Sequence, residues 1–329
     1  PRLLLEGRIW PNAEGPAPGV SGPFTDKARK PRPGMTDPHQ RLKDMDLEGI
    51  DVAVIFGTQI ALTVNGLMNK DLAAALCHAV NEWLIDYCSA DPTRLRAVGL
   101  IPCQDPPAAV RELQYLAKRD VLTAMLPNNV YGINMGDPMF DPIFAEAQEL
   151  DIPLCVHPQT GHDGIPGVSG VMGAGSERFL KYVYVHMTAF PFELMIAMMH
   201  MIGEGVFDRY PRLKVGFMEG GAGWLPYWME RMDEEWEKRG KVEAPLCKKR
   251  PSEYLSSDQF YYGCEPEEKM MGYVVGEIGS ESLMYASDYP HWDMSWPESG
   301  VLIWQREELS LEAKRNILGE NARRFYNLS

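Results

Sequence analysis

The chain has 329 residues, of which 45% are hydrophobic and 24% are charged, and its formal net charge is −14 at pH 7. This composition is typical of a globular enzyme with a large core, and a single α/β barrel accounts for the length. The negative charge argues against nucleic acid or an anionic membrane as a partner, because either would repel the protein at long range.

The cysteines and the most apolar stretch both favour a cytoplasmic protein. Six cysteines occur without a paired C-x-x-C spacing, which indicates reduced and mostly buried thiols. Residues 182–202 form the most apolar long stretch, but His186, Pro191, Glu193 and His200 interrupt it. We therefore expect a Met-rich barrel helix there, with no membrane span.

Residues 1–37 are rich in proline and glycine, which prevents a long regular element. We expect an extended segment or a covering loop there, followed by a single domain over residues 38–329. Within that domain, helical and strand patterns alternate. The expected helices span residues 38–49, 69–90, 106–118, 139–150, 182–202, 224–239, 266–278, 311–318 and 320–326.

Seven short apolar strands fall between these helices, near residues 52, 97, 123, 154, 215, 260 and 285. Strands that alternate with helices predict a parallel sheet, and the size predicts a (β/α)8 TIM barrel. A complete barrel has eight strands, so we expect the first strand to be absent from this sequence, which begins after it.

Three of the strands run directly into a polar residue, namely His157, Glu219 and Asp288. The carboxyl ends of parallel strands share one face, and barrel enzymes place their chemistry on that face. We therefore expect one imidazole and two carboxyl groups to converge around a cation. Imidazole and carboxylate are good ligands for Zn²⁺ or Mn²⁺. Each group also has a structural alternative: a satisfied core histidine, a salt-bridged glutamate and a helix-capping aspartate.

Further candidates lie close to these strand ends. His186, at the start of the apolar helix, is a candidate for substrate contact or catalysis, and His291 is placed to orient Asp288. His162 lies in a Gly-rich loop over residues 161–175, which is long enough to be a lid. Trp224 and Trp292 are candidates for an aromatic pocket wall, although packing is an equally good explanation.

Two common enzyme classes lack their motifs in this chain. No Gly-x-Gly-x-x-Gly follows a strand, which argues against a dinucleotide cofactor, and no Gly-x-Ser-x-Gly nucleophile elbow is present.

Several longer motifs occur together from about residue 46 to the end of the chain. They are His157-Pro158, the run from Phe207 to Val215, the run Gly220-Gly221-Ala222-Gly223-Trp224-Leu225-Pro226, Ser287-Asp288-Tyr289-Pro290-His291, and Gly319-Glu320-Asn321-Ala322. With these motifs the chain resembles the amidohydrolase superfamily, in the branch related to aminocarboxymuconate semialdehyde decarboxylase. That branch contains metal-dependent decarboxylases, hydrolases and hydratases on a (β/α)8 barrel.

The resemblance implies that His157 and Asp288 are metal ligands and that the residue at position 219 handles a proton. Two positions depart from the family pattern. Glu219 stands where the family usually has a histidine, and the usual His-x-His pair of the first strand is missing, since the first histidine here is His39.

The sequence therefore predicts a metal-dependent hydrolase in which Glu219 activates water on a small carboxylated or aromatic substrate. Two alternatives remain open: a non-oxidative decarboxylase of an aromatic or unsaturated acid, and a non-catalytic barrel that has lost its metal. One divalent cation is expected, with zinc preferred and manganese as the alternative. We also expect a homodimer.

Overall fold

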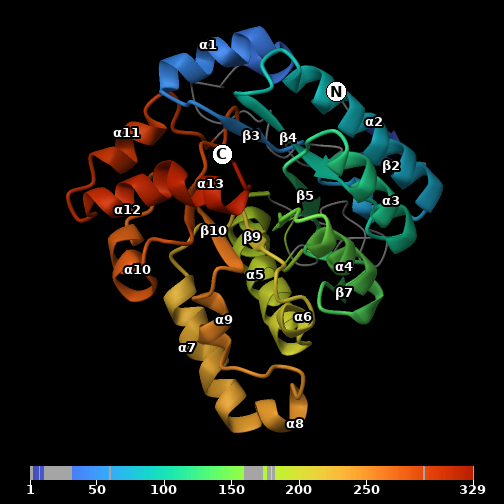
Figure 1. The fold of residues 1–329 in the computed structure, drawn as a ribbon, viewed down its shortest axis with the longest axis vertical. Helices are drawn as coiled ribbons and strands as arrows, with labels where there is room; N and C mark the ends of the chain where they lie inside the picture. The colour runs from blue at the N-terminus through green and yellow to red at the C-terminus, as the bar shows by residue number, and fades with distance from the viewer. Residues whose placement is uncertain are drawn as a thin grey trace.

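The structure, a computed structural model, describes residues 3–6, 8–10, 32–58, 61–158, 173–175, 179, 182–291 and 293–328. Its centre is one curled, parallel sheet in the order β11-β10-β9-β8-β5-β4-β3 (Figure 1). The strands are β3 (Ala53–Ile55), β4 (Leu95–Leu100), β5 (Thr123–Leu126), β8 (Leu154–Val156), β9 (Val215–Phe217), β10 (Phe260–Cys264) and β11 (Leu283–Tyr285).

The helices surround this sheet (Figure 1). They are α1 (Pro38–Glu48), α2 (Lys70–Cys88), α3 (Pro106–Ala117), α4 (Asp141–Glu149), α5 (Tyr182–Gly203), α6 (Val206–Arg209), α7 (Leu225–Glu235), α8 (Lys241–Glu243), α9 (Pro251–Leu255), α10 (Met271–Ile278), α11 (Ser299–Trp304), α12 (Leu311–Arg315) and α13 (Asn321–Phe325). Short 3-10 turns lie at Pro33–Met35, Val64–Gly66 and Pro138–Phe140, and π-helical turns lie at Trp236–Gly240 and Asn316–Glu320.

The first helices begin where side chains satisfy their free backbone N–H groups. The Asp37 carboxylate accepts from His39 N and Gln40 N ahead of α1, and Asn69 accepts from Leu72 N ahead of α2. Asp105 caps α3 in the same way. Each cap stabilises its helix by roughly 1 kcal/mol, and each follows a strand or turn closely enough to fix the entry of the helix.

Successive strand residues point to opposite faces of the sheet, and both faces are buried. On the outer face, side chains such as Val156, Phe217 and Phe260 pack against the helices. The inner face contributes Cys155, Met218, Tyr261 and Met284, which form a separate cluster with Phe325 and Tyr326. The end of the chain therefore packs into the interior of the curled sheet.

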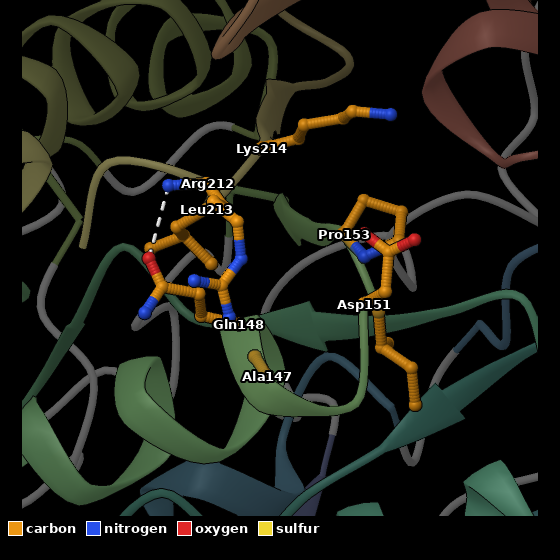
Figure 2. Close-up of a pocket in the computed structure, with 8 residues that line it drawn as sticks. Ala147, Gln148, Asp151, Pro153, Arg212, Leu213 and Lys214 are labelled. Atoms are coloured by element: carbon orange, nitrogen blue, oxygen red, sulfur yellow. Dashed lines mark hydrogen bonds between the residues drawn. The ribbon is translucent and has the colours of Figure 1, made fainter.

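The same C-terminal segment lies at the amino ends of the strands. Lys214 Nζ, just before β9, donates to the Arg324 carbonyl oxygen at 2.9 Å, and Asn327 Nδ2 donates to the Asp151 carbonyl oxygen at 3.1 Å. A small hollow with an empty volume of about 160 Å³ lies at this end, between α4 and the starts of β8 and β9 (Figure 2). Because barrel enzymes use the opposite end, we assign no function to this hollow.

All seven predicted strands are confirmed, and so is the α/β barrel architecture. Within the described part of the chain the barrel is incomplete, because β3 and β11 each pair on one side only. The short helices α6, α8, α9 and α11 were not predicted, and one predicted helix begins later than expected. The predicted 266–278 helix begins only at Met271, because the Glu268 carboxylate folds back onto the backbone N–H of Glu265 and holds residues 265–268 in a turn.

Two short antiparallel hairpins lie outside the main sheet, β1 (Leu3–Leu5) with β2 (Arg8–Trp10) and β6 (Asn129–Val130) with β7 (Ile133–Asn134). Most of residues 1–37 lies outside the described residues, so the division at residue 37 stays a prediction. The predicted apolar helix is α5. In the described residues, Val183–Gly203 is the one helix long and apolar enough to cross a membrane, and 56% of its most apolar window is buried inside the protein.

Candidate active site

His157 directly follows β8 at the carboxyl end of the sheet. Its backbone N–H donates to the Leu126 carbonyl oxygen at 3.1 Å, which continues the ladder with β5 and fixes the position of the residue. Ring atom Nδ1 lies 3.0 Å from the Pro158 carbonyl oxygen. A carbonyl only accepts hydrogen bonds, so Nδ1 carries a hydrogen and Nε2 is the atom presented to the site.

Glu219 follows β9, the strand next to β8. Its Oε2 lies 2.6 Å from Nε2 of His157, and its Oε1 lies 3.6 Å from Nδ1 of His291. The residue has φ +64°, a left-handed conformation that is uncommon outside glycine. The carboxylate is therefore held between two imidazoles by a strained backbone position at the end of the strand.

Asp288 lies just beyond β11 and also has a left-handed backbone, with φ +51°. The backbone N–H of His291 donates to the Asp288 carbonyl oxygen at 2.5 Å, so the two residues share one tight turn. Potential ligand atoms of Glu219, Asp288 and His291 all lie within 4.8 Å of one another. Side chains at positions 157, 219 and 288 thus meet at one mouth of the barrel.

Burial and mutual charge shift the pKa values of this cluster in different directions. Burial alone would raise the pKa of Glu219, but His157 and then His291 outweigh it and hold the pKa well below its ordinary range. Burial and the neighbouring Glu219 charge raise the pKa of Asp288 to about 8. Burial favours neutral His291, but the nearby negative charge of Glu219 outweighs burial and raises the pKa of His291 to about 9. In the same way, Glu219 overcomes burial and raises the pKa of His157.

These side chains fit a divalent cation. Oε2 of Glu219 is fully buried and has no well-aligned hydrogen bond, although His157 Nε2 is within ion-pair distance of it. Next to it, burial and the Glu219 charge raise the pKa of Asp288 to about 8, so its carboxyl favours the protonated form. A bound cation would take the place of that proton. Two carboxylates and two imidazoles suit Mn²⁺ or Zn²⁺. The residues therefore offer ligands whose charge a dication would balance.

His186, on α5, lies at the edge of this cluster. Its Nε2 is 3.9 Å from Oδ2 of Asp293, and its ring centroid is 4.1 Å from that of Phe190. Burial lowers the pKa of His186. On the other side of the site, the Phe56 ring after β3 lies 5.7 Å from the His157 ring. The mouth thus combines titratable groups with aromatic surface.

Trp224 supports the loop that follows Glu219. Its Nε1 donates to the carbonyl oxygens of Gly220 and Gly221 at 3.0 and 2.9 Å, so its polar edge is turned to the loop backbone. His162 and Trp292 were further candidates, and both lie outside the described residues.

Two acidic residues that the sequence analysis did not assign belong to this region. Asp293 pairs with His186, and Oε2 of Glu268 accepts from Ala222 N and Gly223 N at 2.9 and 3.0 Å. A signal for Glu268 was present, because Glu265-Pro266-Glu267-Glu268 follows β10 directly, as the other polar residues follow their strands. A proline followed by two glutamates is also typical of the first turn of a helix, so the run predicts a helix equally well.

The sequence profile of the Amidohydrolase family matches residues 10–328. The chain belongs to the amidohydrolase family. Among its relatives, 2-amino-3-carboxymuconate-6-semialdehyde decarboxylase of Dictyostelium discoideum is 27% identical over 300 residues, which cover 89% of this chain and 77% of the relative. Gamma-resorcylate decarboxylase of Rhizobium radiobacter is 26% identical over 308 residues, covering 88% and 86%. This amidohydrolase therefore lies in the branch that the motifs indicated.

Solved structures agree with the fold. The 2,6-dihydroxybenzoate decarboxylase from Rhizobium superposes with a TM-score of 0.69 at 23% identity, covering 88% of this chain and 87% of that one. The 5-carboxyvanillate decarboxylase of Novosphingobium aromaticivorans, complexed with manganese, gives 0.70 at 25% identity, covering 88% and 80%. The barrel and the enzyme class of this amidohydrolase are thus confirmed, and a divalent metal is supported.

The comparisons favour the decarboxylase, which was the alternative prediction, over the hydrolase, which was the preferred one. Each relative named here is a decarboxylase, which supports that alternative better than the preferred hydrolase. The lowered pKa of Glu219 agrees, because a carboxylate held by two imidazoles is a poor base for activating water. A general base at this position would need burial to raise its pKa towards neutrality, and the two histidines outweigh the effect of burial.

Proposed function

We propose that this protein is a divalent-metal-dependent, non-oxidative decarboxylase of a small aromatic or unsaturated carboxylic acid. The observation that carries the proposal is the meeting of buried His157 with half-buried Glu219, Asp288 and His291 at the carboxyl end of the sheet, in a chain whose named relatives are decarboxylases.

His157, Glu219 and Asp288 are the residues we assign to hold the metal. When bound, the dication would offset the negative charge of the substrate's carboxylate and of an adjacent oxygen. Manganese is preferred to zinc, because the structurally similar 5-carboxyvanillate decarboxylase is described with manganese.

Decarboxylation breaks the bond between the carboxylate and its carbon, leaves the electron pair on that carbon, and needs a proton to complete the product. We assign this proton to His291. The His291 imidazole lies beside the proposed ligands, with Nδ1 3.6 Å from Oε1 of Glu219, and a histidine in this position can carry and deliver a proton. Phe56 and Phe190 contribute apolar surface next to the site for an aromatic ring.

The test is carbon dioxide release by the manganese-loaded protein from 2,6-dihydroxybenzoate, 5-carboxyvanillate and 2-amino-3-carboxymuconate semialdehyde. We expect release from at least one acid, and none from the Asp288→Asn variant. A parallel panel of esters, lactones and amides tests the hydrolase. Turnover of that panel without carbon dioxide release would overturn the proposal. Homodimerisation and a cytoplasmic location stay predictions from the sequence.

A further inference from the structure

Helix α1 turns three charged residues into the protein. Arg41, Asp44 and Glu48 are 7%, 2% and 4% exposed, and their spacing of three and four residues places them on one face. A helix normally buries an apolar face, because burying charged groups is unfavourable unless each finds a partner. The residues that contact Arg41, Asp44 and Glu48 therefore indicate the structural role of this face of α1.

Tyr289, the residue after Asp288, is one such partner. Its hydroxyl donates to Oδ2 of Asp44, and its ring lies under the Arg41 guanidinium with 3.7 Å between Cζ and the ring centroid. The Gly34 backbone also packs closely against Tyr289, since a Cβ at Gly34 would lie 2.4 Å from the Tyr289 hydroxyl oxygen. The Tyr289 side chain is thus held by a hydrogen bond, a cation–π contact and a close backbone approach.

The same face of α1 also holds the rest of the segment that carries the site. The backbone carbonyl oxygen of Asp44 accepts from Trp296 Nε1 at 3.2 Å. Farther along, Oε1 of Glu48 accepts from the Ser299 hydroxyl, whose Oγ lies 2.5 Å from the Tyr285 hydroxyl. Contacts with α1 therefore occur before, within and after the loop that follows β11.

That loop needs external support, because its own geometry is unfavourable. Asp288 adopts φ +51°, a left-handed conformation that is unfavourable for a residue with a side chain, and its carboxyl lies beside the Glu219 charge. In Figure 1, α1 lies along the top of the molecule, above α11 and β3. The contacts from α1, together with the close approach of Gly34, hold the loop on this side.

We propose that the buried polar face of α1 positions the metal site, with Asp44 and Arg41 acting through Tyr289 to hold Asp288 and His291 in their binding geometry. This inference rests on the proposed metal function. It assigns Asp44, Arg41 and Tyr289 as positioning residues, since none of them is a ligand.

The experiment measures Mn²⁺ affinity by calorimetric titration of the full chain, together with thermal stability. Tyr289→Phe removes the hydroxyl and keeps the ring, and Asp44→Ala removes its acceptor. We expect each variant to bind Mn²⁺ about 10- to 100-fold more weakly, as for residues that orient metal ligands. The double variant should lose little more than either single one, because both substitutions break the same hydrogen bond.

The matched control is Tyr254→Phe, which removes another tyrosine–aspartate hydrogen bond, the 2.6 Å contact from the Tyr254 hydroxyl to Asp208 Oδ2 between α9 and α6. This variant should lose stability and keep wild-type Mn²⁺ affinity. Asp44→Asn keeps an acceptor for Tyr289 and should retain most of the affinity, which supplies a folded comparison if Asp44→Ala does not fold.

The outcomes distinguish failure of the positioning role from failure of the proposed metal-dependent function. If wild-type protein binds Mn²⁺ and Asp288→Asn abolishes binding, but Tyr289→Phe binds within twofold of wild type, the positioning role is overturned and the metal site stands. If wild-type protein binds no Mn²⁺, both proposals fail.

Discussion

Nε2 of His157 lies 2.6 Å from Oε2 of Glu219, although the two residues end different strands. Little of either side chain is exposed to solvent, so each charge depends on the other for stabilisation. Above its ordinary pKa, Glu219 contributes stability that is lost only in strong acid. His157 contributes below its ordinary pKa, and that contribution is lost as the pH rises through its raised value. The pair therefore favours the native state most between the ordinary pKa values of the two groups.

Glu219→Gln keeps the shape of the side chain and removes its charge. We expect the pKa values of His157 and His291 to fall, because the carboxylate that raises both is gone. Histidine titration by NMR measures this directly, and decarboxylation should fall by roughly 100-fold or more. Unchanged histidine pKa values would contradict the ion-pair arrangement.

Binding of Mn²⁺ should depend on pH through Asp288. Its carboxyl keeps a proton up to about pH 8, and a metal ligand must be deprotonated. Affinity should therefore rise by at least roughly tenfold per pH unit from pH 6 to pH 8, because Asp288 must lose its proton and His157, whose pKa is also raised, must be neutral. Titrations at pH 6, 7, 8 and 9 measure the slope. An affinity that stays flat or falls over this range would exclude Asp288 as a ligand.

His291→Asn separates proton transfer from metal binding. If His291 supplies the proton, kcat should fall by about 10²–10⁴-fold while Mn²⁺ affinity changes far less than in Asp288→Asn. The two measurements are single-turnover kinetics and metal titration. Equal losses of affinity in the two variants would instead identify His291 as a ligand, which its place within 4.8 Å of Glu219 and Asp288 permits geometrically.

Glu268→Ala should loosen the loop after Glu219. Ala222 N and Gly223 N lose their acceptor, so we expect the free energy of unfolding to fall by about 1 kcal/mol. Chemical denaturation measures the change. Glu267→Ala, one residue earlier and exposed, is the control and should be neutral. Equal stability of the two variants would show that the Glu268 contact is not stabilising.

Local patterns in the sequence were enough to determine the strands and the place of the chemistry. Each strand has a short apolar run ended by glycine, proline or a polar residue, and parallel strands bring their carboxyl ends together whatever lies between them. His157, Glu219 and Asp288 were therefore predicted to meet from their positions alone, and the family followed from the motifs around them.

Only the tertiary structure decided how these groups affect one another. The pKa of Glu219 depends on two histidines from β8 and from the loop after β11, and charge interactions depend on distances that no local pattern encodes. The same holds for Glu268 and for the charged face of α1, whose partners lie far along the chain. Secondary structure depends mainly on residues that are neighbours in the sequence. The chemistry of this site depends on contacts between residues far apart in the sequence, which form only in the folded sheet.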